Sequence, residues 1–247
     1  MEFTGYETWK IWRIVVLYIR GESGAMQVLQ YKERQFNVED NIKFAKKANY
    51  YFIKRSIDIL GALFGILLLS PILLVTALLI VIESKGSPIF IQTRVGKKGK
   101  LFNMYKFRSM VVDAEVLIDK LKDKNEMSGP MFKMKEDPRV TRIGKFVRKT
   151  SIDELPQLIN VLIGDMSLVG PRPNLPKEVS QFTGYQRQKL MAKPGITCYW
   201  QVMGRSNIGF EQWIELDIKY IKERSLWIDL KLIIKTFGVL FGDRNAC

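Results

Sequence analysis

Residues 57–82 read IDILGALFGILLLSPILLVTALLIVI, the most apolar stretch of the chain. Of these 26 residues, 18 are Leu, Ile, Val or Phe, and the only charged residue is Asp58. Each such residue contributes roughly −0.3 to −0.6 kcal/mol to the free energy of insertion into a bilayer, so the 18 residues together contribute about −5 to −11 kcal/mol. A straight helix of this length would run about 39 Å, enough to cross a hydrocarbon core of about 30 Å. The stretch therefore predicts a membrane-inserted helix.

Two features favour a helix that turns back over one that crosses. Ser70 and Pro71 fall at the midpoint, where proline removes a backbone donor and a serine hydroxyl can satisfy the freed carbonyl, so we expect a sharp bend. Cations flank both ends, and the positive-inside rule then places both ends in the cytoplasm. These cations are Lys43, Lys46, Lys47, Lys54 and Arg55 before the stretch and Lys85, Arg94, Lys97, Lys98 and Lys100 after it. We predict a re-entrant helical hairpin over residues 50–84, with a kinked spanning helix as the alternative.

Charge and composition restrict the chemistry of the rest. The chain of 247 residues has a formal net charge of +14 and a pI near 9.7, which indicates an anionic partner such as nucleic acid, an acidic membrane or a phosphorylated substrate. It has no histidine, the usual acid–base group at neutral pH. Its two cysteines, Cys198 and Cys247, make no zinc pattern and no disulfide framework. Chemistry must therefore rest on carboxylates, Lys, Arg, Tyr or Cys.

A second stretch, residues 151–173, reads SIDELPQLINVLIGDMSLVGPRP and contains two adjacent acids, Asp153 and Glu154. Ser151 and Glu154 fit the spacing of a capping box, and Pro156 suits a first turn if Asp153 is the cap, so we expect a helix to begin here. Cations surround the acids in sequence: Arg139, Arg142, Lys145 and Arg148 before them and Arg172 after them. Capping acids and solvated basic helix faces are common, so the pattern alone leaves a structural role open.

The remaining segments predict an α+β fold with a small β element. Residues 87–110 alternate like strands, with turn glycines Gly96 and Gly99, and residues 111–127 look helical. Residues 210–221 and 230–241 carry apolar side chains at helical spacing, which indicates amphipathic helices that pack in the core or lie on lipid. We divide the chain into an N-terminal extension of unknown role (1–49), the membrane hairpin (50–84) and a mostly helical cytoplasmic domain (85–247).

Several ordered motifs resemble the bacterial sugar transferase family, the monotopic polyprenyl-phosphate hexose-1-phosphate transferases. The resemblance covers about residues 50–245 and corresponds to the small, catalytic-core form. It rests on KR-x-x-D (54–58), the Ser70-Pro71 break, YKFRSM (105–110), DELPQL from Asp153, GDMSLVGPRP (164–173) and KPGITCYWQV (193–202).

The resemblance implies transfer of a sugar-1-phosphate from a UDP-sugar to polyprenyl (undecaprenyl) phosphate, with release of UMP, at the cytoplasmic face of the bacterial inner membrane. Asp153 would be the nucleophile, forming a phosphosugar-aspartyl intermediate, and Glu154 a Mg²⁺ ligand. Since an anionic nucleophile must approach an anionic diphosphate, cations are required. The candidate substrate-binding cations are Lys106, Arg108, Arg148, Arg172 and Arg205. We further expect Lys54 and Arg55 to hold lipid phosphates at the membrane surface.

The rival interpretation is a membrane-tethered basic binding or scaffold protein without catalysis. It would suit the charge and the membrane segment, but it leaves the Asp153–Glu154 pair and the ordered motifs unexplained. No nucleic-acid-binding motif is recognisable, so we expect no nucleic-acid partner. Neither the sugar, the polysaccharide pathway nor the oligomeric state follows from the sequence, because selectivity between sugars depends on a few contacts worth about 1–3 kcal/mol each.

Overall fold

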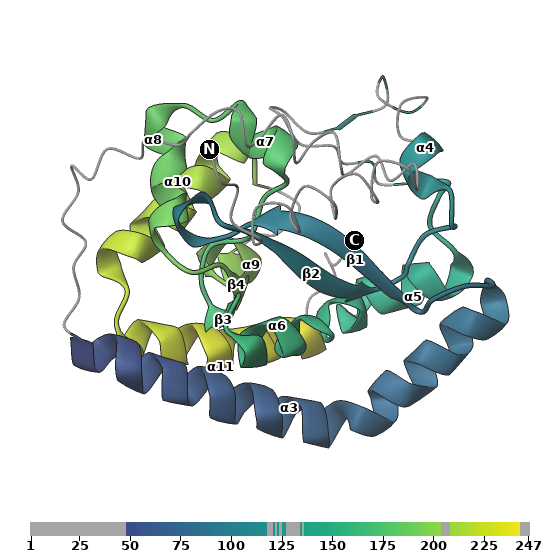
Figure 1. Ribbon diagram of the computed structural model, residues 1–247, viewed down its shortest axis with the longest axis horizontal. Helices are drawn as coiled ribbons and strands as arrows, with labels where there is room; N and C mark the ends of the chain where they lie inside the picture. Colours follow the sequence, from purple (N-terminus) through teal and green to yellow (C-terminus); the bar gives the residue numbers. More distant parts are fainter. Residues whose placement is uncertain are drawn as a thin grey trace, which may run out of the picture. The chain divides into compact units, whose positions relative to one another are not determined.

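The computed structural model describes residues 48–117, 121, 123, 125–126, 134, 136–203 and 208–242. The chain forms two compact units, Met1–Asn37 and Val38–Cys247, and every described residue belongs to the second. Most of the predicted N-terminal extension and the predicted site residue Arg205 lie outside the described residues. Helices and two small sheets make up the described unit, in agreement with a mixed helix-and-sheet class (Figure 1).

The apolar stretch forms one continuous helix, α3 (Ala48–Glu83), with Pro71 inside it. The Ser70 hydroxyl donates to the Leu67 carbonyl at 2.8 Å, which is the carbonyl that the missing N–H of Pro71 leaves without its helical partner. Figure 1 shows the helix bent near its middle, with both arms along the same side of the domain. Among the described residues, α3 is the one helix long and apolar enough to cross a membrane. The re-entrant hairpin stays a prediction.

Two short sheets follow. Strands β1 (Ile89–Val95) and β2 (Leu101–Phe107) form an antiparallel hairpin, as the alternating pattern predicts. Their connection is a 3₁₀ turn, η1 (Lys97–Gly99). Strands β3 (Ser167–Val169) and β4 (Gly195–Thr197) pair in parallel.

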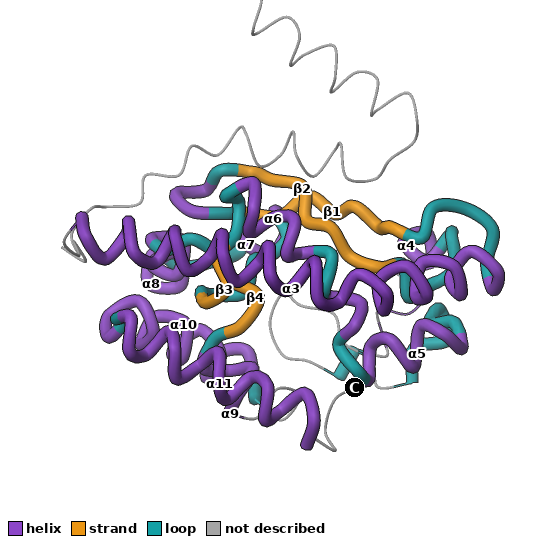
Figure 2. The backbone as a smooth tube through the Cα atoms, turned by 90° about the horizontal axis from the view of Figure 1, so that it is seen from below, coloured by secondary structure: helices purple, strands orange, loops and turns teal. Residues whose placement is uncertain are grey.

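Short helices surround these sheets. They are α4 (Ala114–Leu117), α5 (Arg142–Lys149), η3 (Ile152–Glu154), α6 (Gln157–Ile163), α7 (Pro176–Ser180), α8 (Gly184–Arg187), η4 (Gln188–Met191), α9 (Tyr199–Met203), α10 (Phe210–Glu223) and α11 (Leu226–Gly242). The stripe predicted on α10 is core, because Trp213, Ile214, Ile218 and Ile221 are buried. Helix α11 instead exposes Trp227, Leu230 and Ile234 on one face. Figures 1 and 2 place α11 beside α3.

Helix α3 contributes to the hydrophobic core of the domain. Ala62 of α3 is fully buried in one cluster with Phe102 and Met104 of β2 and Leu158 of α6. Glycine permits this close contact, since a Cβ built on Gly61 would lie 2.7 Å from a methyl group of Leu168. One side of α3 is therefore part of the folded domain.

The KR-x-x-D motif ties the first half of α3 to three other elements. Lys54 forms an ion pair with Asp229 of α11 at 2.9 Å. Arg55 donates to the Val161 and Leu162 carbonyls at the end of α6, at 2.6 and 2.7 Å. The buried Asp58 carboxylate accepts from the Ser167 hydroxyl and the Leu168 N–H of β3, both at 2.9 Å. The motif thus fastens the helix to the domain.

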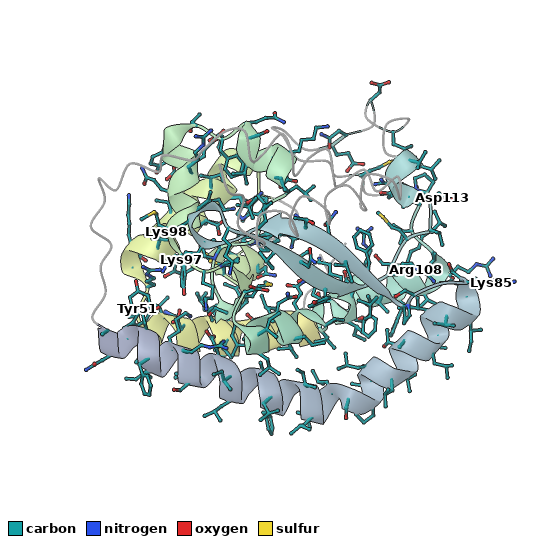
Figure 3. The ribbon with its side chains drawn as sticks, in the orientation of Figure 1. Tyr51, Lys85, Lys97, Lys98, Arg108 and Asp113 are labelled. Atoms are coloured by element: carbon teal, nitrogen blue, oxygen red, sulfur yellow. The ribbon has the colours of Figure 1, made fainter. Side chains whose placement is uncertain are left out.

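The other end of α3 is fastened as well. The Glu83 carboxylate accepts from the Ile143 N–H at the start of α5, at 3.1 Å. Arg108, directly after β2, donates to the carbonyls of Ser84 and Lys85, and Figure 3 shows it beside Lys85 at this end. Both ends of α3 therefore contact the same folded domain.

The predicted capping box at residues 151–154 is wrong. Ser151 adopts a left-handed conformation with φ +57°, and its side chain makes no capping hydrogen bond. The chain first makes the 3₁₀ turn η3, and α6 begins only after Pro156. The two acids thus lie on a tight turn between α5 and α6, where Asp153 is buried.

Candidate active site

The two acids have different surroundings although they are adjacent. Asp153 is 8% exposed, and burial raises the pKa of its carboxyl above the ordinary value of 3.8. Lys106, Arg148 and Arg172 oppose this rise, while the charge of Glu154 adds to it. Asp153 is therefore a buried and more basic carboxyl group on which three cations act.

Glu154 is held by two cations from distant parts of the chain. Lys106 of β2 approaches Glu154 Oε1 at 2.9 Å, and Arg172, which follows β3, approaches the same oxygen at 3.4 Å. The Arg172 guanidinium also stacks on the ring of Trp200, 5.2 Å from its centroid. Three of the predicted site residues therefore meet at one point.

These residues line a small pocket beside the β1–β2 hairpin. Its lining residues are Arg94, Met104, Lys106, Glu154, Gln157, Arg172, Pro173, Gly195, Ile196 and Gln201. Three of them are cations and one is a carboxylate, so the pocket carries a positive excess that favours negative charge nearby.

Arg94 is the pocket residue that sequence reasoning missed, because we assigned it to the charges flanking the membrane segment. It donates to the Pro173 carbonyl at 3.2 Å and to the Gln92 side chain, while its buried Nε has no hydrogen-bond partner among the described residues. Burial lowers the pKa of Arg94 to about 10, so it stays charged at neutral pH. The sequence signal that could have indicated Arg94 is its position on a predicted strand. Alternation of side chains places Arg94 on the same face of that strand as Gln92.

The other predicted cations lie elsewhere. Arg148 is exposed at the end of α5, where its charge still acts on Asp153. Arg108 binds the end of α3, away from Glu154. Lys54 and Arg55 are paired with protein groups, which gives them a structural function, and their proposed contact with lipid phosphate stays a prediction.

Asp153 and Glu154 could bind a Mg²⁺ ion only together with the phosphate oxygens of a substrate. Among the described residues, no group of three or more His, Cys, Asp or Glu side chains is placed to hold a metal. Mg²⁺ is commonly bound by one or two carboxylates together with substrate phosphates and water. Glu154 at the pocket wall, with Asp153 next to it in sequence, could provide the one or two carboxylates of such a site.

Sequence comparison shows the family to which the chain belongs. The model of the bacterial sugar transferase family matches residues 49–243, which include α3, the pocket and α11. The chain belongs to this family.

Three curated relatives show the range of the similarity. The chain is 48% identical over 204 residues to a galactosyl transferase of Streptococcus agalactiae, covering 81% of this chain and 44% of that protein. It is 38% identical over 223 residues to an undecaprenyl-phosphate galactose phosphotransferase of Salmonella typhimurium, covering 89% and 46%. It is 43% identical over 204 residues to a UDP-N-acetylgalactosamine-undecaprenyl-phosphate N-acetylgalactosaminephosphotransferase of Aeromonas hydrophila, covering 79% and 46%. The chain spans less than half the length of these relatives.

Proposed function

We propose that this protein transfers a sugar-1-phosphate from a UDP-sugar to a polyprenyl phosphate and releases UMP. The observation that carries the proposal is the positively charged pocket beside a buried aspartate, with Lys106 and Arg172 converging on Glu154. The names of the Salmonella and Aeromonas relatives support the same class of substrates. Because these names include galactose and N-acetylgalactosamine, the sugar is left open.

The reaction we propose has two displacements at one phosphorus atom. A carboxylate oxygen of Asp153 attacks the phosphorus that bears the sugar, the bond from this phosphorus to the bridging oxygen breaks, and UMP leaves with the electron pair. An oxygen of the polyprenyl phosphate then attacks the phosphosugar-aspartyl intermediate, and the Asp153 carboxylate leaves. The products are a polyprenyl diphosphate sugar and free enzyme, so neither step requires a histidine.

The pocket residues lower the repulsion between anions in both steps. Arg94, Lys106 and Arg172 offer fixed positive charge near the position that the donor diphosphate would take. A Mg²⁺ ion held by Glu154 and the diphosphate would add charge neutralisation there. Trp200 restricts the orientation of Arg172 through ring stacking, which reduces the entropy lost on binding.

The first test is UMP release from a panel of UDP-sugars by the purified chain in detergent, with Mg²⁺ and undecaprenyl phosphate. Release with one donor would support the proposal and identify the sugar. No release from any UDP-sugar, by protein that remains folded, would count against it.

Metal dependence provides a separate prediction. Removal of divalent ions with EDTA should abolish UMP release, and added Mg²⁺ should restore it. Glu154→Gln keeps the size of the side chain but removes its charge, so the variant should need about tenfold more Mg²⁺ for half-maximal rate, or lose activity. Titration of Mg²⁺ against rate measures this. An unchanged Mg²⁺ requirement in Glu154→Gln would remove Glu154 as a metal ligand.

Arg94→Met should raise the KM for the UDP-sugar by about 10- to 100-fold, because a buried charge-assisted contact is worth about 1.5–3 kcal/mol. Arg94→Lys retains the charge but loses the fork geometry, so its loss should be smaller. Steady-state kinetics with varied donor measure the effect, and Lys177→Met, at an exposed position of α7, is the control. If kcat fell and KM did not change, Arg94 would position the loop that contains Arg172 and would not bind the donor.

We also propose that α3 enters and leaves the same leaflet, with the pocket at the cytoplasmic face of the inner membrane. Both ends of α3 contact one folded domain, through Lys54, Arg55 and Asp58 at one end and Glu83 at the other. A helix that crossed about 30 Å of hydrocarbon would place its ends on opposite sides, where one domain could not contact both. The bend at Pro71 supports the same topology (Figure 1).

A further inference from the structure

A second group of cations surrounds Tyr51 at the start of α3, apart from the pocket. The Tyr51 ring lies 5.4 Å from the Lys97 ammonium and 5.6 Å from the Arg224 guanidinium, measured to its centroid. Arg224 also donates to the Tyr51 hydroxyl at 2.9 Å. Figure 3 shows Lys97 and Lys98 of the hairpin turn η1 above Tyr51. With Lys193, these residues form what we call the Tyr51 cluster.

Among the described residues, the charges that act on the Lys97 ammonium are positive. Burial lowers the pKa of Lys97, and the charges of Arg224 and Lys98 lower it further. Burial also lowers the pKa of Lys193, and the charges of Arg55 and Lys97 lower it further. The charges of Asp58 and Asp165 act in the opposite direction. Cations held together in this way bind an anion favourably, because the anion relieves their mutual repulsion.

The Arg55 and Lys193 side chains lie at the opposite end of α6 from Asp153. A Cβ built on Gly164, which ends α6, would lie 3.4 Å from Arg55 and 3.9 Å from the Lys193 ammonium. Asp153 precedes the other end of this helix, whose seven residues span about 10 Å. An anion in the Tyr51 cluster is therefore too far away to react with Asp153.

Position relative to α3 indicates the class of ligand. The first turns of α3 expose Phe52 at 75% and Leu60 at 67%, so the membrane-facing surface begins directly beside Tyr51. Tyrosine and long cationic side chains favour this boundary, since each has an apolar part and a polar end. Lys54 and Arg55, which we expected to contact lipid phosphate, are already paired with protein groups. Lys97 and Lys98 are exposed.

We propose that the Tyr51 cluster binds the headgroup phosphate of an anionic phospholipid, which does not enter the reaction. Lys97 and Lys193 contact the phosphate, and Arg224 holds Tyr51 at the boundary with the acyl chains. This site stands independently of the proposed catalytic function, because it requires only that α3 lies in a membrane.

The test follows thermal unfolding of the full chain in detergent as phosphatidylglycerol or phosphatidylcholine is added to the micelles. Phosphatidylglycerol should raise the Tm of the wild-type protein, and phosphatidylcholine should not. Lys97→Glu should weaken the response to phosphatidylglycerol about fivefold or more, because one lysine near an anionic surface contributes about that factor in affinity. Lys97→Arg should retain it. Lys177→Glu, the same charge change at an exposed position of α7, is the matched control.

Other results would overturn the proposal. Equal responses to the two lipids in the wild-type protein, or equal losses in Lys97→Glu and Lys177→Glu, would mean that the Tyr51 cluster has no part in headgroup binding. Undecaprenyl phosphate should still raise the Tm of Lys97→Glu, because its phosphate must reach Asp153. If Lys97→Glu lost that response and kept the response to phosphatidylglycerol, the Tyr51 cluster would be an acceptor site instead.

Discussion

Asp153→Asn is expected to abolish UMP release and, at neutral pH, to stabilise the folded protein. The rate should fall about 10³-fold or more, because the amide oxygen is a poor nucleophile and the covalent step is lost. Stability should rise because the neutral amide of the variant carries no charge into a buried site, whereas burial raises the pKa of the Asp153 carboxyl and so disfavours its ionised form. Initial rates and thermal unfolding of both proteins, in the same detergent, measure the two effects.

The pH dependence of this stability difference has a definite sign. The folded state holds the Asp153 proton more tightly than the unfolded chain, whose carboxyl has a pKa near 3.8. The stability that the folded state gains from binding this proton is fully present below pH 3.8. It is lost as the pH rises through the raised pKa of Asp153 in the folded state. The gain from Asp153→Asn should therefore be largest near neutral pH and shrink in acid. Equal Tm values for the two proteins at neutral pH would contradict the burial argument, and full activity in the variant would exclude Asp153 as nucleophile.

Lys189→Met should destabilise the fold by about 3–5 kcal/mol. Lys189 Nζ lies 2.7 Å from Asp217 Oδ2, and both side chains are at most 1% exposed. Removing the cation would leave the Asp217 carboxylate buried without its partner. For a chain of this size the loss corresponds to a fall in Tm of about 6–20 °C, measurable by thermal unfolding in detergent.

Two further variants test whether the loss of stability in Lys189→Met comes from the unpaired charge of Asp217. Lys177→Met removes an exposed lysine and should leave Tm nearly unchanged. Lys189→Met combined with Asp217→Leu removes both charges and should recover most of the stability, since well-packed apolar residues can replace a buried ion pair. If the double variant were less stable than Lys189→Met alone, the loss would come from altered packing rather than from an unpaired charge.

The same ion pair supports the pocket through aromatic rings. The Lys189 ammonium lies 4.7 Å from the centroid of Trp213, and the rings of Trp213 and Trp200 are 5.2 Å apart. Trp200 in turn stacks with Arg172 at the pocket wall. Variants at Lys189 should therefore affect donor binding as well as stability.

Sequence patterns predicted those features whose physical cause is local. The apolar run predicted α3, alternation between turn glycines predicted the β1–β2 hairpin, and helical spacing predicted α10. Lys106, Glu154 and Arg172, which the sequence offers as candidate site residues, are in contact in the structure, and their role in catalysis stays a prediction. Periodicity and charge are properties of short windows, so they can be read without the fold.

Features that depend on distant partners could not be predicted in this way. Lys54 and Arg55 looked free for lipid because their partners, Asp229 and the end of α6, lie more than 100 residues away. Arg94 was missed since its partner, the Pro173 carbonyl, belongs to a loop 79 residues later. The capping box failed because Ser151 takes a left-handed conformation that its sequence spacing does not reveal.

The burial of Ala62 against Phe102 and Leu158 has a practical consequence for protein production. In many membrane-anchored enzymes the anchor can be deleted to give a soluble catalytic fragment. Here a fragment that began at residue 86 would lose one side of its core and expose the apolar side chains of β2 and α6 to water. Such a fragment should aggregate, so preparation of this protein requires a detergent, nanodisc or bilayer from the moment it is synthesised.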